Sequence, residues 1–128
     1  MSTILKSKRL SFTSLDFYEN YVISKMDEGT VFDSVLCQQM VDACLEFFNG
    51  NSFIYIANRV NHYNVDPMIY LGLGKYTVFK GIAIVDKTSS SINLAAFEKN
   101  FTRYPFEIFD NLSDATTWAD DLIKKVGL

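Results

Sequence analysis

The chain has 128 residues, of which 48% are hydrophobic and 21% are charged, and its formal net charge is −3 at pH 7. This length and composition predict a single globular domain over residues 1–128 and exclude an intrinsically disordered chain. The sequence pI is about 5.0, and the charges form no basic stripe along the chain. Nucleic-acid binding is therefore not expected, because contacts with phosphates supply most of the affinity of such proteins.

The location of the protein is predicted from its N-terminus and its cysteines. The opening MSTILKSKRL has no long apolar stretch, so we expect no signal peptide, and no run reaches the roughly 18 apolar residues of a membrane span. Cys37 and Cys44 are the only cysteines and lie about 10 Å apart along one predicted helix, too far for a disulfide. We expect a cytoplasmic protein with two reduced, buried thiols.

The first third of the chain predicts two strands and a helix. Residues 9–15 and 17–26 are rich in β-branched and aromatic residues and predict an antiparallel hairpin that turns near Leu15 and Asp16. Apolar residues recur at three- and four-residue steps over 34–48, which predicts an amphipathic helix. Its expected N-cap is Asp33, just before the helix, and its expected stop is the glycine in FFNGN.

The middle of the chain predicts a buried strand followed by a short helix. The run FIYIA at 53–57 is continuously apolar, as expected for a strand that is covered on both faces. Asp66 can cap a helix, and Pro67 loses nothing at the first helical position by lacking an N–H group. We therefore expect a helix over 67–73, limited by the two glycines at its end.

The last third predicts two more strands and two more helices. Residues 79–86 form a second buried-strand run, and the serines at 89–91 are suitable caps for a helix at 92–101. A short strand at 105–109 and a final amphipathic helix, capped by Asn111, complete the chain.

This order, β-β-α-β-α-β-α-β-α, predicts an α/β fold. Strands that alternate with helices indicate right-handed crossovers and a mostly parallel central sheet, here of about five strands with four helices. The N-terminal hairpin adds an antiparallel member. If segment 17–26 lies at the sheet edge, it can pair with a copy of itself, so a homodimer is a further prediction.

The sequence contains no pattern that predicts a catalytic or metal site. GLGK at 72–75 lacks the spacing and the following Ser or Thr of a phosphate-binding loop. His62 is the only histidine and has no paired cysteines or carboxylate group beside it, so neither a metal nor another cofactor is expected. Two alternatives stay open. The serines at 89–91 could bind an anion, and an enzyme would have to use His62 with Tyr63 or Asp66.

The polar loop 58–66 holds the candidate binding residues. It follows a buried parallel strand, and in open α/β sheets binding sites gather beyond the carboxyl ends of the strands. The residues that we expect to contact a partner there are Asn58, Arg59, Asn61 and Tyr63. The alternative is purely structural, because Asn side chains satisfy the backbone of turns and an Arg can tie a loop with several donors.

Four stretches carry a resemblance to a known family. They are ENYVISKMDEGTVFD (19–33), YIANRVNHYNVDP (55–67), GIAIVDK (81–87) and EKNFTRYPFEIFDNLSDATTWADDL (98–122). In this order they resemble the small bacterial STAS, or SpoIIAA-like, proteins, including those described as STAS/SEC14 domain-containing. The resemblance covers nearly the full chain and implies a single SpoIIAA-like domain.

The resemblance also implies where a partner binds. In STAS regulators a phosphorylatable serine lies in the loop after the third strand, and partners meet the domain there. The corresponding stretch here, ANRVNHYNVDPM, has no Ser or Thr, so no residue takes over that role. We expect a non-enzymatic interaction or regulatory module that binds a protein partner through this loop. The alternative is a carrier of a small molecule, either a lipid or a nucleotide, and an enzyme is the less favoured reading.

Overall fold

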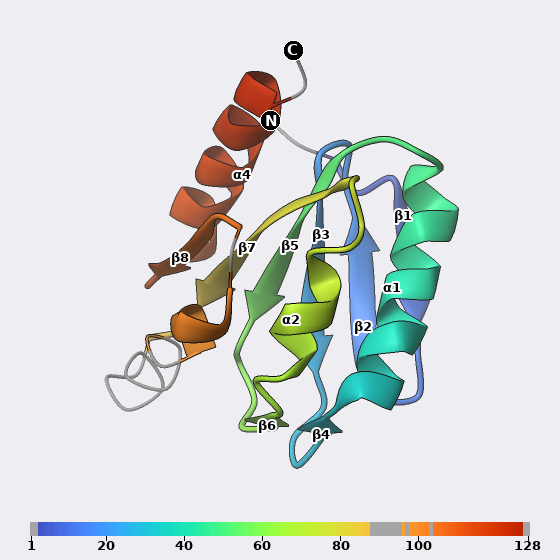
Figure 1. The fold of residues 1–128 in the computed structure, drawn as a ribbon, viewed down its shortest axis with the longest axis vertical. Coiled ribbons are helices and arrows are strands. Elements are labelled where there is room, and N and C mark those ends of the chain that lie inside the picture. The colour runs from blue at the N-terminus through green and yellow to red at the C-terminus, as the bar shows by residue number, and fades with distance from the viewer. Residues whose placement is uncertain (1–2, 88–95, 97, 103, 127–128) are drawn as a thin grey trace.

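The computed structural model describes residues 3–87, 96, 98–102 and 104–126, which form a mixed α/β structure around one six-stranded sheet (Figure 1). Along the sheet, the first two pairs of neighbouring strands are antiparallel, and the remaining three pairs are parallel. In spatial order the strands are β1 (Lys6–Arg9), β2 (Thr13–Phe17), β3 (Tyr21–Met26), β5 (Phe53–Asn58), β7 (Phe79–Val85) and β8 (Phe106–Phe109).

The helices lie on both faces of the sheet. Helices α1 (Ser34–Phe48) and α2 (Ile69–Leu73) cover one face, and α4 (Leu112–Val126) covers the other (Figure 1). The strands between them are buried on both sides because neighbouring side chains point to opposite faces. In β5, Tyr55 packs in the core under α1 and α2, whereas Ile54 and Ile56 pack with the alanines of α4.

The prediction of buried central strands is confirmed. All residues from 53 to 57 are buried in β5, and β7 is buried along its length except at Lys80. Among the described residues, none of the helices has the length and apolar character needed to span a bilayer.

The predicted first helix and its caps are confirmed. A carboxylate oxygen of Asp33 accepts a hydrogen bond from the Leu36 amide at 3.0 Å. The helix ends at Asn49, whose φ of 46° is left-handed, and Gly50 follows with a φ of 93°. Both conformations are rare for L side chains, which explains why Asn and Gly occupy these positions.

The other helices follow the sequence closely where they are described. Helix α2 begins at Ile69, two residues later than predicted, with Met68 as its N-cap, so the prediction that Asp66 caps it and that Pro67 opens it is wrong. The Asp66 carboxylate instead accepts from the Met68 amide at 3.0 Å, in the turn before the helix. Asn111 caps α4 by accepting from the Asp114 amide at 2.8 Å. Half of the predicted helix at 92–101, with the serines before it, lies outside the described residues. Its end forms the 3₁₀ helix η1 (Lys99–Phe101), so the described chain shows three α-helices where four were predicted.

The predicted N-terminal hairpin is correct in kind but wrong in position. Strand β2 continues through Asp16 to Phe17, and the chain reverses at residues 18–20. An unpredicted strand, β1, lies beside β2, and Ser7 donates its hydroxyl to the Asp16 carboxylate at 2.7 Å. Asp16 therefore has a partner within the sheet, between the buried Leu15 and Phe17. A polar residue inside an alternating strand had suggested a turn instead.

The structure also corrects the argument for a homodimer through segment 17–26. Strand β3 lies between β2 and β5, so it is an interior strand with both sides paired. The edges of the main sheet are β1 and β8. The strand count differs too, because a separate two-stranded sheet joins β4 (Val31–Phe32) to β6 (Asn64–Val65).

Gly81 in β7 provides a test of how tightly this core is packed. A Cβ at this position would meet the Pro105 carbonyl oxygen at 3.0 Å, a Leu122 methyl at 3.2 Å and an Ile54 methyl at 3.3 Å. We expect Gly81→Ala to lower the free energy of unfolding by about 1–3 kcal/mol, the usual cost of overpacking. Gly72→Ala in α2 is the control, because nothing lies within 4 Å of its Cβ. Equal stability of both variants in urea denaturation would contradict the packing described here.

Candidate functional site

The candidate site lies at the carboxyl end of β5, where the chain enters the loop at 58–66. Arg59 directs its side chain inward, with 10% of it exposed, and its Nη2 donates to Glu98 Oε1 at 2.8 Å. Its Nε donates to the Tyr63 hydroxyl at 3.2 Å, and the guanidinium carbon lies 5.5 Å from the centre of the Tyr63 ring. Arg59 and Tyr63, both predicted to contact a partner, are therefore brought together inside the molecule, where they bind each other.

Glu98 is the residue that the sequence analysis missed. It is 5% exposed, and its Oε1 also accepts from the Tyr70 hydroxyl of α2 at 2.8 Å. The other oxygen, Oε2, is buried and has no hydrogen-bond partner among the described residues. One carboxylate oxygen thus joins the end of β5, helix α2 and the segment before η1. We name the group of Arg59, Tyr63, Tyr70 and Glu98 the buried polar cluster.

Burial sets the protonation of this cluster. Loss of solvent raises the pKa of Tyr63 and raises the pKa of Tyr70 well above its ordinary value, and the Glu98 carboxylate raises both further. Burial alone would lower the pKa of Arg59, but Tyr63 and Glu98 outweigh it and the pKa rises. At neutral pH both hydroxyls therefore keep their protons, and the guanidinium stays charged: the Tyr63 hydroxyl accepts from Arg59, and the Tyr70 hydroxyl donates to Glu98. This arrangement supports the loop and activates neither tyrosine as a nucleophile.

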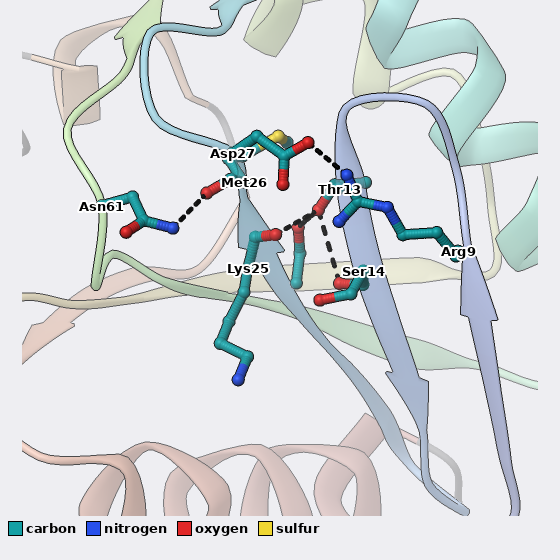
Figure 2. Close-up of polar contacts among 8 residues, drawn as sticks. Arg9, Thr13, Ser14, Lys25, Met26, Asp27 and Asn61 are labelled. Carbon is teal, nitrogen blue, oxygen red and sulfur yellow. Dashed lines mark hydrogen bonds and ion pairs between the residues drawn. The ribbon is translucent and has the colours of Figure 1, made fainter.

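The asparagines of the loop have different positions. Asn61 is exposed, yet its Nδ2 donates to the carbonyl of Met26 at the end of β3, at 3.0 Å (Figure 2). Asn58 is the half-buried last residue of β5, and its carbonyl accepts from the Val60 amide at 3.0 Å. Close to Asn61, Asp27 pairs with Arg9 (Figure 2). The Asn61 side chain thus performs the structural role that turn residues often have.

The small sheet of β4 and β6 ties the loop to the segment before α1. The Gly29 amide donates to the His62 carbonyl at 2.8 Å, and the Asn64 amide donates to the Thr30 carbonyl at 2.9 Å. A third bond runs from the Asp66 amide to the Phe32 carbonyl at 3.0 Å. The side chain of His62 is exposed, which places it away from the buried polar cluster.

Apolar side chains are exposed on the segments around this loop. Seven large hydrophobic residues are exposed in the described chain, and all but Ile4 and Leu5 belong to segments 31–35 and 60–71. Figure 1 shows β4, β6 and the first turn of α1 gathered at one end of the molecule. The five exposed residues of these segments have exposed fractions from 53% to 63%. We name them the apolar end: Val31, Val35, Val60, Met68 and Leu71.

The other candidates from the sequence show no assembled chemistry. GLGK lies at the end of α2 and does not follow a strand, unlike a phosphate-binding loop. Within the described residues, no group of three or more His, Cys, Asp or Glu is placed to hold a metal ion. Cys37 and Cys44 are free and buried, and burial raises their pKa to about 11 and about 12. The thiols therefore stay protonated and unreactive at neutral pH.

The complete arrangement is that of a SpoIIAA-like fold, as the sequence resemblance implied. A solved structure of an uncharacterised protein of the DUF3478 family, from Shewanella loihica PV-4, has a SpoIIAA-like fold and is similar to this chain. The likeness covers 93% of this chain and 95% of the other, with a TM-score of 0.57 and 17% sequence identity. No family model and no curated protein matches the sequence. The likeness therefore establishes the fold, and the site itself has to indicate the function.

The ion pair at the centre of the buried polar cluster gives a direct test. In Arg59→Met the Glu98 carboxylate stays buried without its charge partner, so we expect a loss of about 3–5 kcal/mol in the free energy of unfolding. The double variant Arg59→Met/Glu98→Gln removes the stranded charge and should be more stable than the single variant.

An exposed ion pair serves as the control in the same urea titrations. Lys8 Nζ lies 3.9 Å from Glu46 Oε2, with the two side chains 39% and 75% exposed against 10% and 7% for Arg59 and Glu98, and Lys8→Met should cost less than about 1 kcal/mol. A loss equally small in Arg59→Met would show that the buried pair does not hold this end of the molecule together.

Proposed function

We propose that this protein is a non-enzymatic interaction or regulatory module that binds a protein partner through its apolar end. The observation that carries the proposal is that five of the seven exposed large hydrophobic residues in the described chain belong to segments 31–35 and 60–71, which include and flank the loop at 58–66. Contiguous apolar surface is uncommon on monomeric soluble proteins and usually marks an interaction site. Two free, buried thiols fit a reducing compartment, so we place the interaction in the cytoplasm.

Three of the residues predicted to contact a partner, Arg59, Asn61 and Tyr63, hold the loop at 58–66 in place by their hydrogen bonds. Arg59 and Tyr63 hold the loop from inside, Asn61 anchors it to β3, and Val60 lies exposed between them. A surface loop that is already ordered loses little conformational entropy when a partner binds, which favours affinity. The partner contacts that we propose are therefore Val60 and Met68 with their exposed neighbours, together with the outer face of Asn61.

The fold agrees with a binding role but does not identify the partner. STAS regulators meet their partners at the loop after the third strand, and the loop at 58–66 occupies the equivalent position. The stretch from Asn58 to Met68 contains no Ser or Thr, so we propose no phosphorylation switch within it. Binding would then depend on the exposed apolar side chains themselves, which a charge should disrupt.

A charge-insertion experiment tests the proposal. The double variant Val60→Asp/Met68→Asp puts two carboxylates on the apolar end, at side chains that are 62% and 58% exposed. We expect at least a tenfold loss of the captured partner in affinity purification quantified by mass spectrometry, with little change in thermal stability because the sites are in solvent.

The matched control is Ile4→Asp/Leu5→Asp. These side chains are 47% and 61% exposed and belong to the segment just before β1, outside segments 31–35 and 60–71. Partner capture by this control should equal that of the wild type. If both double variants retain the same partner, the apolar end is not the contact surface.

A second candidate function, a small-molecule carrier, is favoured by one groove. It has a volume of about 510 Å³ and is lined by aromatic and small residues of α2, β7 and the segment around η1. Pockets of about 300–1,000 Å³ with apolar and aromatic walls are typical of small-molecule sites. The lining residues are Tyr70, Leu71, Gly74, Phe79, Phe101 and Tyr104.

Native mass spectrometry tests this candidate by comparing a variant whose groove is filled by a new side chain with a control variant. Gly74→Leu adds a side chain inside the groove, whereas Gly72→Leu adds one outside it; neither glycine has an atom within 4 Å of a Cβ. A carrier should show a lipid or nucleotide mass that survives in the Gly72 variant and disappears in the Gly74 variant. Absence of any bound mass on the wild type, before and after incubation with lipids and nucleotides, would count against a carrier.

A further inference from the structure

Strand β8 is one of the two edges of the main sheet. The Ile82 amide donates to the Pro105 carbonyl and the Asp86 amide to the Phe109 carbonyl, both at 2.9 Å. In a parallel ladder the backbone groups of alternate residues face the neighbouring strand, so Phe106 and Ile108 direct theirs away from β7. Within the described residues, these outward amide and carbonyl groups have no hydrogen-bond partner. Strand β8 therefore offers a free template for one more strand.

The two edges differ in how they are protected. Strand β1 has the sequence KSKR, and positive charge on an edge strand opposes the addition of another strand. Strand β8 has the sequence FEIF, with one charge at Glu107 and half-buried Ile108 and Phe109. In Figure 1, β8 forms the outer border of the sheet opposite β1. Of the two edges, β8 is thus the one that can accept a further strand.

We propose that β8 pairs with the β8 of a second copy of this chain, antiparallel and about a two-fold axis. Such pairing joins the two sheets into one, and the outer strands of the joined sheet are then the two cationic β1 strands. Growth stops there, because each β1 edge repels a further strand. A contact between β1 and β8 of different copies would instead leave one edge free at each end and produce open chains.

The charge on Glu107 selects the register of this pairing. If the two-fold axis passed through Glu107, the two Glu107 side chains would lie directly opposite each other in a closely spaced pair, which is destabilising. An axis through Ile108 satisfies the same outward backbone groups and places Glu107 opposite Phe109 of the second copy. In this register the two Ile108 residues face each other as a hydrogen-bonded pair, with Cα atoms about 5.5 Å apart.

Cysteine crosslinking and molar mass together test the pairing. A Cα separation of about 5.5 Å lies within the range for a disulfide, so Ile108→Cys should form a covalent dimer under mild oxidation. Cys37 and Cys44 are buried with raised pKa values and do not compete. Ser7→Cys, at the β1 edge, is the matched control and should stay monomeric in the same oxidant.

Light scattering over a concentration series completes the test. The wild type should reach twice the monomer mass, and Ile108→Pro should shift towards monomer because proline lacks the outward amide. Ser7→Pro, at the other edge, should keep the wild-type mass, and circular dichroism should show that both proline variants are folded.

Three results would each overturn the proposal. They are a wild type that stays monomeric at every concentration, a dimer that Ile108→Pro leaves intact, and crosslinking of Ile108→Cys that is no faster than that of Ser7→Cys. Masses above the dimer would show the open β1–β8 contact and would overturn it as well.

Discussion

The buried ion pair between Arg59 and Glu98 organises the part of this molecule around the loop at 58–66. Removing two charges from water costs several kcal/mol per ion, and the attraction of the pair compensates only when further hydrogen bonds complete the geometry. Here Tyr63 supplies such a bond to the guanidinium, and Tyr70 supplies one to the carboxylate. The pair joins parts of the chain 39 residues apart, so it fixes how the loop, α2 and the segment before η1 fit together.

The surface of this end follows from that interior. Because Arg59 and Tyr63 bind inward, two of the polar residues that stand out in the sequence make their hydrogen bonds inside the protein. The bonds between β4 and β6 hold the loop against the segment before α1. Valine and methionine side chains then remain outside, on a backbone that is already ordered.

The sequence predicted those parts of the fold that depend on local patterns. The continuous apolar runs of β5 and β7 and the caps at Asp33 and Asn111 need only neighbouring residues, and the structure confirms them. Strand β1 could not be predicted in the same way, because the polar KSKR is a strand only by virtue of its pairing with β2. The two-residue strands β4 and β6 are too short to produce a periodic pattern. Glu98 resembled an ordinary solvated helix residue, since its partners lie far away in the sequence.

The central claim is that the buried polar cluster holds the loop in place, and amide hydrogen exchange tests it most directly. The Gly29 amide bonds to the His62 carbonyl and the Asn64 amide to the Thr30 carbonyl, so both join the loop to the segment before α1. The amides of β5 belong to the main sheet. We expect Arg59→Met to speed the exchange of the Gly29 and Asn64 amides much more than that of the β5 amides. Unchanged protection at Gly29 and Asn64 in a folded Arg59→Met protein would contradict it.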